Sequence, residues 1–174
     1  MACLSDDTIY LRALEPEDLE VLYKWENDTS LWGNGSTINP YSRFTLKEYI
    51  TRSLDENILE MRQLRFMICL KENGKAVGTA DLFDIDPFHN RAALGLFVTS
   101  EHRKQGIANR SLRIITEYAA DTLLLHQIYV QIACNNKACI AMFDRSDFTK
   151  CGILKEWLRS KNGYLDVAVY QKVL

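Results

Sequence analysis

The sequence of 174 residues lacks the features that would indicate a membrane protein or several domains. It has no apolar run near the roughly 18 residues of a membrane-spanning helix, and no apolar segment follows a basic start as in a secretory signal peptide. It also has no internal repeat, low-complexity tract or linker rich in proline, glycine or serine. We therefore expect one globular domain over residues 1–174, without a membrane partner and with a cytoplasmic location.

Cysteine is too scarce and too irregularly spaced for a disulfide scaffold or a zinc site. The five residues are Cys3, Cys69, Cys134, Cys139 and Cys151. Their number is odd, the chain is long for a disulfide-stabilised mini-domain, and no spacing resembles that of zinc ligands. We expect reduced thiols and no metal.

The chain also lacks an excess of positive charge. Lysine and arginine total 21 against 23 aspartate and glutamate, for a net charge of -2. This balance gives no electrostatic footprint for nucleic acid, so we expect no nucleic-acid partner. Hydrophobic residues at 47% and charged residues at 25% are typical of a globular protein.

The hydrophobic patterns predict the element order β-α-α-β-β-β-α-β-α-β-β. Strands are expected at 8–14, 64–70, 75–84, 92–98 and 126–133, and two more on either side of 161–163; helices are expected at 16–27, 45–54, 107–120 and 137–145. The pair Asn73-Gly74 predicts a hairpin turn, and Thr45-x-x-Glu48 predicts a capping box at the start of a helix. The expected fold is α/β (of the α+β type), a mixed, strongly twisted sheet of about seven strands with helices on both faces.

The most informative segment is Arg-Lys-Gln-Gly-Ile-Ala at 103–108, between an apolar strand and a helix. A turn that closes on glycine and opens a helix presents free backbone N–H groups and the positive end of the helix dipole. Gly106 lets the backbone approach a ligand without an intervening Cβ. The segment therefore predicts an anion site suited to a pyrophosphate.

Two motifs together carry a family resemblance. The pattern Arg-x-x-Gly-x-Ala at 103–108 resembles the acyl-coenzyme-A motif of the GNAT N-acetyltransferases. Asn136-x-x-Cys139-x-x-x-Phe143-x-x-x-Asp147-Phe148 resembles the Asn-x-x-Ser-x-x-x-Tyr-x-x-x-Gly-Phe run of the same superfamily. The opening residues 9–18 and the closing hairpin resemble the branch that contains the ribosomal-protein N-terminal and the spermidine/spermine acetyltransferases. The resemblance implies a GNAT fold, acetyl-CoA as cosubstrate, direct acetyl transfer to a primary amine, and no metal.

The resemblance also implies where acetyl-CoA binds. The residues assigned to it are Phe97, Val98, Thr99, Arg103, Lys104, Gln105, Gly106, Ile107, Ala108, Asn109, Asn136, Cys139 and Phe143. Backbone N–H groups at 97–99, splayed open at a bulge, are expected to bind the thioester carbonyl. Asn136 is expected either to bind the pantetheine arm or to cap the helix after it.

Two positions depart from the family pattern. Phe143 stands where the family has a tyrosine acid, so the hydroxyl is absent, and Ala93 stands where many relatives have a glutamate base. The remaining candidates for catalytic carboxylates are Asp81 and Asp84. Since they are three residues apart, a regular strand would place them on opposite faces, and Asp81 is favoured. His89 and His102 are further candidates for a base because of the ordinary pKa range of histidine.

The acceptor site is expected at Glu26, Asp28, Trp32 and Asp81, with the loop from Trp32 to Ser36 and the faces of tryptophans as a wall for an ammonium group. A polyamine is the favoured acceptor, and a protein or peptide N-terminus is the alternative. Loss of both proton-transfer residues also leaves open a CoA-binding module with weak or no catalysis. Because direct transfer needs mainly positioning and carbonyl polarisation, the enzyme is favoured, and a homo-oligomer stays open.

Overall fold

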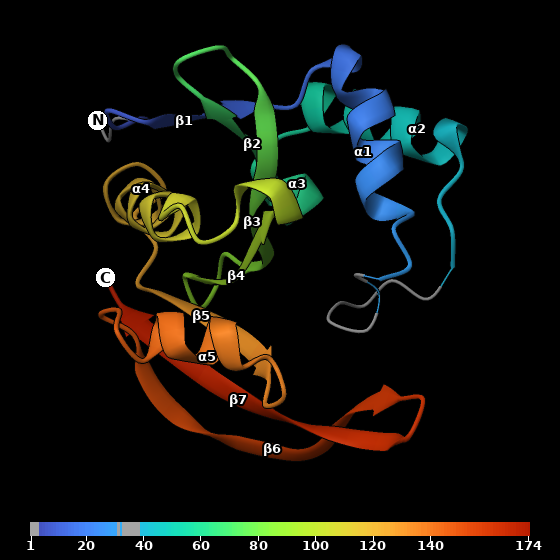
Figure 1. The fold of residues 1–174 in the computed structure, drawn as a ribbon. Helices are drawn as coiled ribbons and strands as arrows, with labels where there is room; N and C mark the ends of the chain where they lie inside the picture. Colours follow the sequence, from blue (N-terminus) through green and yellow to red (C-terminus); the bar gives the residue numbers. More distant parts are fainter. Residues whose placement is uncertain (1–3, 31, 33–38) are drawn as a thin grey trace.

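The protein forms one seven-stranded sheet in a computed structural model that describes residues 4–30, 32 and 39–174 (Figure 1). The strand order is β1-β2-β3-β4-β5-β7-β6. The strands are β1 (Ile9–Ala13), β2 (Leu64–Leu70), β3 (Ala76–Asp86), β4 (Arg91–Val98), β5 (Gln127–Ala133), β6 (Thr149–Ser160) and β7 (Gly163–Val173). The helices are α1 (Leu19–Glu26), α2 (Arg43–Asp55), α3 (Ile58–Met61), α4 (Ile107–Asp121) and α5 (Lys137–Phe143), with 3-10 turns η1 (Pro16–Asp18) and η3 (Ser100–His102). The predicted order and fold class are confirmed, with α3 and the 3-10 turns added.

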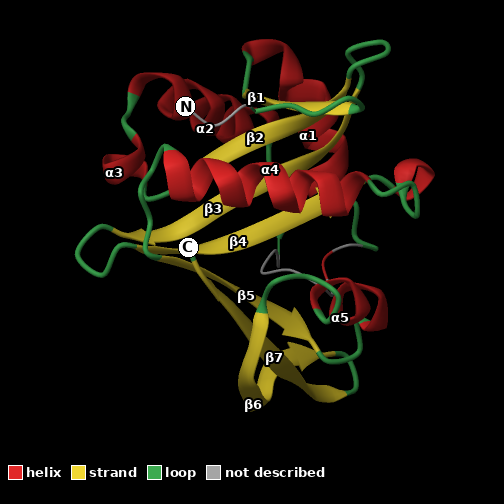
Figure 2. Cartoon of the chain, turned by 90° about the vertical axis from the view of Figure 1, so that its left-hand side faces the viewer, coloured by secondary structure: helices red, strands yellow, loops and turns green. Residues whose placement is uncertain are grey.

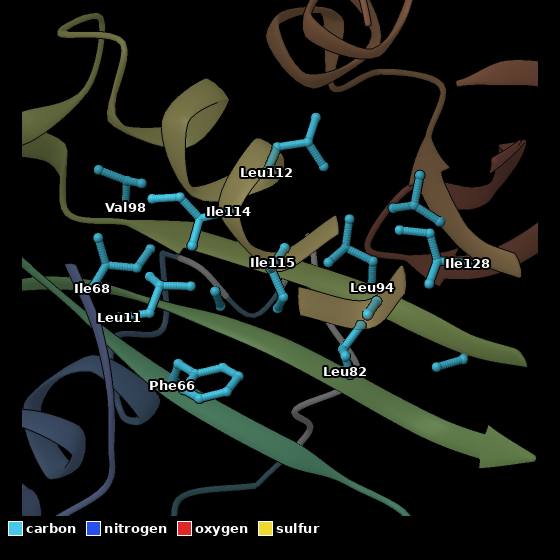
Figure 3. Packing of buried hydrophobic residues seen from close by; sticks show 14 of the residues in the cluster. Leu11, Phe66, Ile68, Leu82, Leu94, Val98, Leu112, Ile114, Ile115 and Ile128 are labelled. Atoms are coloured by element: carbon cyan, nitrogen blue, oxygen red, sulfur yellow. The ribbon is translucent and has the colours of Figure 1, made fainter. Parts of the chain in front are cut away.

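Helices cover both faces of the sheet, α4 on one and α1 with α2 on the other (Figure 2). The alternation along β2 produces this division, because successive side chains in a strand point to opposite faces. Phe66 and Ile68 belong to the core beneath α4, where Ile114 and Ile115 of that helix pack over the sheet (Figure 3). Met67 belongs to a second core cluster beneath α1 and α2.

Strands β4 and β5 are parallel but pair over only three residues each. The pairs run from Arg91↔Gln127 to Ala93↔Tyr129. Beyond Ala93, β4 stays paired with β3, while β5 stays paired with β7 along its whole length. The two strands therefore diverge and open a gap toward their carboxyl ends.

The bulge predicted for the backbone N–H groups at 97–99 is not present in the β3–β4 pairing. The β3–β4 register is continuous from Gly78↔Val98 to Phe83↔Ala93, and the register shift lies between Phe83 and Asp86. The gap opens instead because β5 leaves β4 after Tyr129.

The start of α2 also differs from prediction. The side chain of Ser42 accepts a hydrogen bond from the Thr45 amide at 3.0 Å, so the helix begins at Arg43. Thr45 is a donor within the first turn, and not the cap. Both residues are good N-caps, and the earlier one prevails because its side chain satisfies a free helix amide.

The C-terminal hairpin extends beyond the rest of the sheet. Strands β6 and β7 pair from Thr149↔Gln171 to Ser160↔Gly163, with two irregularities (Figure 1). Most of β6 is exposed, because it is the edge strand. Within the described part of the chain, no helix combines the length and apolar character needed to cross a bilayer.

Asp6 anchors the N-terminal segment to α4. Its carboxylate accepts hydrogen bonds from the amides of Thr8 (2.8 Å) and Ile9 (2.9 Å) and pairs with Arg110 (2.8 Å) and Arg113 (3.3 Å). Burial alone would raise the pKa of Asp6, but the hydrogen bonds from Ile9, Arg110 and Thr8 outweigh it and lower the pKa to about 2.

Because the pKa of Asp6 is lower in the folded protein than the ordinary value of 3.8, the ionised carboxylate stabilises the fold at pH values above 3.8. This stabilisation is lost as the pH falls toward 2 and the carboxylate is protonated. We expect Asp6→Asn to lower the free energy of unfolding by about 2 kcal/mol at pH 7. The difference from the wild type should shrink between pH 4 and pH 2, which urea unfolding across that range measures. A difference that does not change with pH would contradict the assignment.

Candidate active site

The turn before α4 forms an open cradle of backbone amides. Lys104 and Gly106 both adopt left-handed backbone conformations, with φ of 61° and 79°. Such alternation turns successive N–H groups to one side and favours an anion. No acceptor within the described residues takes up the first-turn amides of Ile107, Ala108 and Asn109. A Cβ added to Gly106 would meet no protein atom within 4 Å, so the cradle has room for a phosphate group.

Side chains around the cradle connect it to the end of β4. The Arg103 Nε donates to the Val98 carbonyl at 3.0 Å, and Thr99 Oγ1 lies 2.9 Å from His102 Nδ1. The Gln105 amide donates to the Glu101 carbonyl at 3.1 Å, while the Lys104 side chain is exposed. Arg103 therefore also braces the loop, and Lys104 is the cation free to meet a phosphate.

Of the backbone donors expected at 97–99, the geometry favours Val98. The Thr99 amide donates to the Val77 carbonyl of β3 at 2.9 Å. Thr99 was predicted to offer this N–H to a ligand, and in this structure it does not. Because N–H groups alternate sides along a strand, the Val98 amide points toward the gap. The Phe97 carbonyl, in the same peptide unit, lies only 2.0 Å from where a Cβ of Gly78 would be. Any residue larger than glycine at 78 would clash with this carbonyl, so Gly78 allows β3 to lie close to the peptide unit between Phe97 and Val98.

A buried ion cluster lies on the face of the sheet beneath α1. Arg65 of β2 donates through Nε to Asp81 Oδ1 and through Nη1 to Glu26 Oε1 at 2.6 Å. Thr79 Oγ1 donates to the other oxygen of Asp81, Oδ2, at 3.2 Å. Asp81 is only 7% exposed, so it is not the solvated strand residue that its polarity alone would indicate.

Burial raises the pKa of Asp81 above its ordinary value, although Arg65 and Thr79 act in the opposite direction. Burial likewise raises the pKa of Tyr49 to about 12, and the Tyr49 ring centroid lies 5.6 Å from the Arg65 guanidinium. A carboxylate with a raised pKa is a stronger base than a solvated aspartate.

Arg65 was not predicted as a site residue. Its signal in the sequence is a lone charge near the start of an otherwise apolar strand. The partnership becomes visible only through the register, in which Arg65 lies directly opposite Asp81.

Asp84 does not share the buried position of Asp81. The strand is not regular at Asp84, because the β3 register shifts between Phe83 and Asp86 and Asp84 adopts φ 49°. Its side chain is exposed. The pKa of Tyr129 on β5 is raised, first by the burial of Tyr129 itself and then by the negative charge of Asp84.

The residues predicted to form the acceptor wall lie at the end of α1 and just after it. The Trp25 ring packs edge-on against Phe97 of β4 at 5.3 Å, and Trp32 Nε1 donates to the Glu26 carbonyl at 2.9 Å. Asp28 accepts from the Ser30 amide (3.0 Å) and hydroxyl (2.6 Å). The remaining predicted loop residues, 33–36, lie outside the described residues.

On the other side of the gap, α5 begins with Asn136 as its cap. The Asn136 side chain accepts a hydrogen bond from the Cys139 amide at 3.2 Å. Of the two roles expected for Asn136, this contact is the one that caps the following helix. Cys139 is half-buried, and burial raises the pKa of its thiol to about 11. Phe143 is 2% exposed, and its ring packs against Phe148 at 5.0 Å and Tyr170 at 5.8 Å. The described cysteines are free thiols.

The burial of Phe143 predicts the effect of restoring a tyrosine there. Because the ring is enclosed mostly by apolar core residues, a new hydroxyl would be removed from water on folding. We expect Phe143→Tyr to lower the free energy of unfolding by about 1–3 kcal/mol with no gain in kcat. Phe44, which is 69% exposed, supplies the control, since Phe44→Tyr should change neither quantity. Retained stability together with a rise in kcat would show that the ring edge reaches the reacting thiol.

A polar groove of about 470 Å³ runs from the first β4–β5 pair, Arg91 and Gln127, along β5 and β7. Its lining residues are Arg91, Gln127, Tyr129, Gln131, Val169 and Gln171. The Gln171 amide donates to Gln127 Oε1 at 2.7 Å. The lining has carboxamides, a phenol and one cation, but no carboxylate. Elsewhere in the described part of the chain, no three His, Cys, Asp or Glu side chains are grouped so as to hold a metal.

Comparisons with known proteins agree with this geometry. Residues 8–149 match the family model described as an acetyltransferase (GNAT) domain. The uncharacterized N-acetyltransferase p20 of Bacillus licheniformis is 25% identical over 98% of this chain and 95% of its own length. The spermidine N(1)-acetyltransferase of Escherichia coli K12 is 25% identical over 86% of this chain and 77% of its own. The spermidine N-acetyltransferase of Vibrio cholerae, crystallised with CoA and spermine, superposes with a TM-score of 0.87 at 23% identity, covering 97% of this chain and 96% of that one.

Proposed function

We propose, on the premise that this chain belongs to the GNAT acetyltransferase family, that it transfers the acetyl group of acetyl-CoA to a primary amine in the gap between β4 and β5. The chain is an N-acetyltransferase by that membership. The observation that carries the placement is the divergence of β4 and β5 beyond Ala93, directly before the amide cradle at Gly106. The gap leaves the Val98 amide without a β5 partner, as a donor for the thioester carbonyl.

The residues around the gap have separate tasks in this reaction. The first-turn amides of α4 and Lys104 bind the pyrophosphate, and the Val98 N–H polarises the carbonyl. The amine nitrogen attacks the carbonyl carbon, the C–S bond breaks, and CoA leaves as the thiolate. Asp81 takes the proton from the amine, and water protonates the thiolate, because Phe143 has no hydroxyl to do so.

A polyamine such as spermidine is the proposed acceptor. The spermidine acetyltransferases among the relatives support this choice. The charges of Glu26, Arg65 and Asp81 sum to one negative charge, which attracts an ammonium group. Asp28 adds an exposed carboxylate at the end of α1.

A peptide α-amine is the second candidate acceptor. The polar groove supports it, because carboxamides and Arg91 hydrogen-bond to peptide carbonyls, whereas a polycation would be better met by carboxylates.

The test is CoA release from acetyl-CoA with a panel of spermidine, spermine, a tripeptide with a free N-terminus and the same tripeptide blocked. We expect saturable release with spermidine, a mass-identified acetylated product, and no release with the blocked peptide. CoA release with the free tripeptide, and with neither polyamine, would show that the acceptor is a peptide α-amine. Tight acetyl-CoA binding without release for any amine would overturn the catalytic proposal in favour of a CoA-binding module.

A further inference from the structure

Three residues form a row across three strands on the face beneath α1. Arg65 of β2 is the register partner of Asp81 of β3, and Asp81 is the register partner of Gly95 of β4. The row ends at the gap, because Gly95 lies beyond Ala93, the last β4 residue that pairs with β5.

Asp81 has a side chain on three of its four sides within the sheet. Arg65 binds Oδ1 from β2, while Thr79 and Phe83 lie two residues away on the same face of β3. Only Gly95, on the β4 side, has no side chain with which to cover the carboxylate. The Asp81 side chain keeps 11% of its surface exposed, and Gly95 is itself partly exposed.

Neither backbone conformation nor packing requires glycine at position 95. Its φ is not among the positive values, unlike those of Gly74, Gly106 and Gly163. An added Cβ would lie 3.4 Å from Phe83 Cε1, 3.6 Å from Asp81 Cβ and 3.8 Å from Asp81 Oδ2, which are ordinary contact distances. Glycine within a strand costs roughly 0.5–1 kcal/mol relative to alanine. The space that this glycine leaves beside Oδ2 therefore calls for another explanation.

We propose that Gly95 is the access position through which the acceptor's primary ammonium group reaches Asp81 Oδ2, so that residue 95 determines which amines bind. The proposal rests on the proposed function. Arg65 is shared between Glu26 and Asp81 Oδ1, so the three groups together keep one negative charge for the incoming cation. Tyr49 is a further titratable group in electrostatic contact with Arg65, Glu26 and Asp81. A Cβ at position 95 would occupy the space 3.8 Å from Oδ2, through which an unbranched alkylammonium enters more readily than an N-substituted one.

Gly95→Ala tests this proposal, with Gly152→Ala on β6 as the control. A Cβ at Gly152 would meet no atom within 4 Å, and the position is exposed and far along the chain from the site. We expect Gly95→Ala to raise the KM for spermidine about tenfold or more. Its acetyl-CoA affinity and Tm should equal or exceed those of the wild type. Gly152→Ala should leave the KM unchanged.

The contrary result is a Gly95→Ala enzyme with the wild-type KM for spermidine and intact acetyl-CoA binding, which would overturn the access role. Calorimetric titration of spermidine into the CoA-bound protein keeps this test separate from the proposed function. Even if the wild type released no CoA, weaker spermidine binding by Gly95→Ala would support the access position. Equal binding by both proteins, or no binding to either, would refute it.

Discussion

Gly106→Ala is expected to weaken acetyl-CoA binding by about 10- to 100-fold while the fold remains intact. The added methyl group meets no protein atom within 4 Å, so only a bound ligand is displaced by it. Displacing the phosphates from one backbone amide removes a hydrogen bond to a charged group, worth about 1.5–3 kcal/mol. Calorimetry with acetyl-CoA measures the change.

Gly74→Ala is the matched control for this variant. Gly74 has φ 72° in the turn between β2 and β3, close to the 79° of Gly106, so alanine meets the same backbone strain of about 1–2 kcal/mol at both positions. Both variants should lose similar stability, and only Gly106→Ala should lose affinity. Equal affinities in the two variants would show that the pyrophosphate binds elsewhere.

Asp81→Asn is expected to lower kcat by about 10²- to 10⁴-fold, the usual worth of a general base. Acetyl-CoA affinity should not change, because the proposed function has Asp81 act on the acceptor and not on the phosphates. Since the base must be ionised and burial raises its pKa, the wild-type rate should rise with pH above the range of an ordinary aspartate. This rise of the rate with pH should be absent in Asp81→Asn.

Asp18→Asn separates catalysis from the cost of breaking a buried ion pair. Asp18 is 5% exposed and binds Arg12 through two hydrogen bonds of 2.6 and 2.7 Å, away from the gap. Both variants should destabilise the fold, as the loss of one partner of a buried pair does. If Asp18→Asn lowered kcat as much as Asp81→Asn, the role of Asp81 would be structural only.

The fold and the anion cradle were predictable because their signals are local. Asn73-Gly74 predicts a turn that needs positive φ, and Gly74 indeed has φ 72°. The glycine-closed turn at 103–108 predicts the left-handed Gly106 that caps α4. The periodicity of α4 likewise predicts which of its residues are buried, among them Ile107, Leu112 and Ile115.

The ion cluster and the gap were less predictable because they depend on contacts between distant segments. The pairing of Arg65 with Asp81 and Glu26 follows from strand register and from the place of α1, which no local pattern contains. The gap depends on where β5 leaves β4, and an apolar strand has the same pattern whether one of its edges is paired or open. The Asn136 motif placed Phe143 on a helix, but it gave no information on which side of that helix faces the core.

The most direct test is a single turnover with acetyl-labelled acetyl-CoA and spermidine, in which the label is followed on CoA, protein and amine. Direct transfer in the gap between β4 and β5 predicts that the label appears on the amine at the rate at which free CoA thiol appears, with none on the protein. Label recovered on the protein, or retained on CoA while every amine stays unmodified, would contradict it.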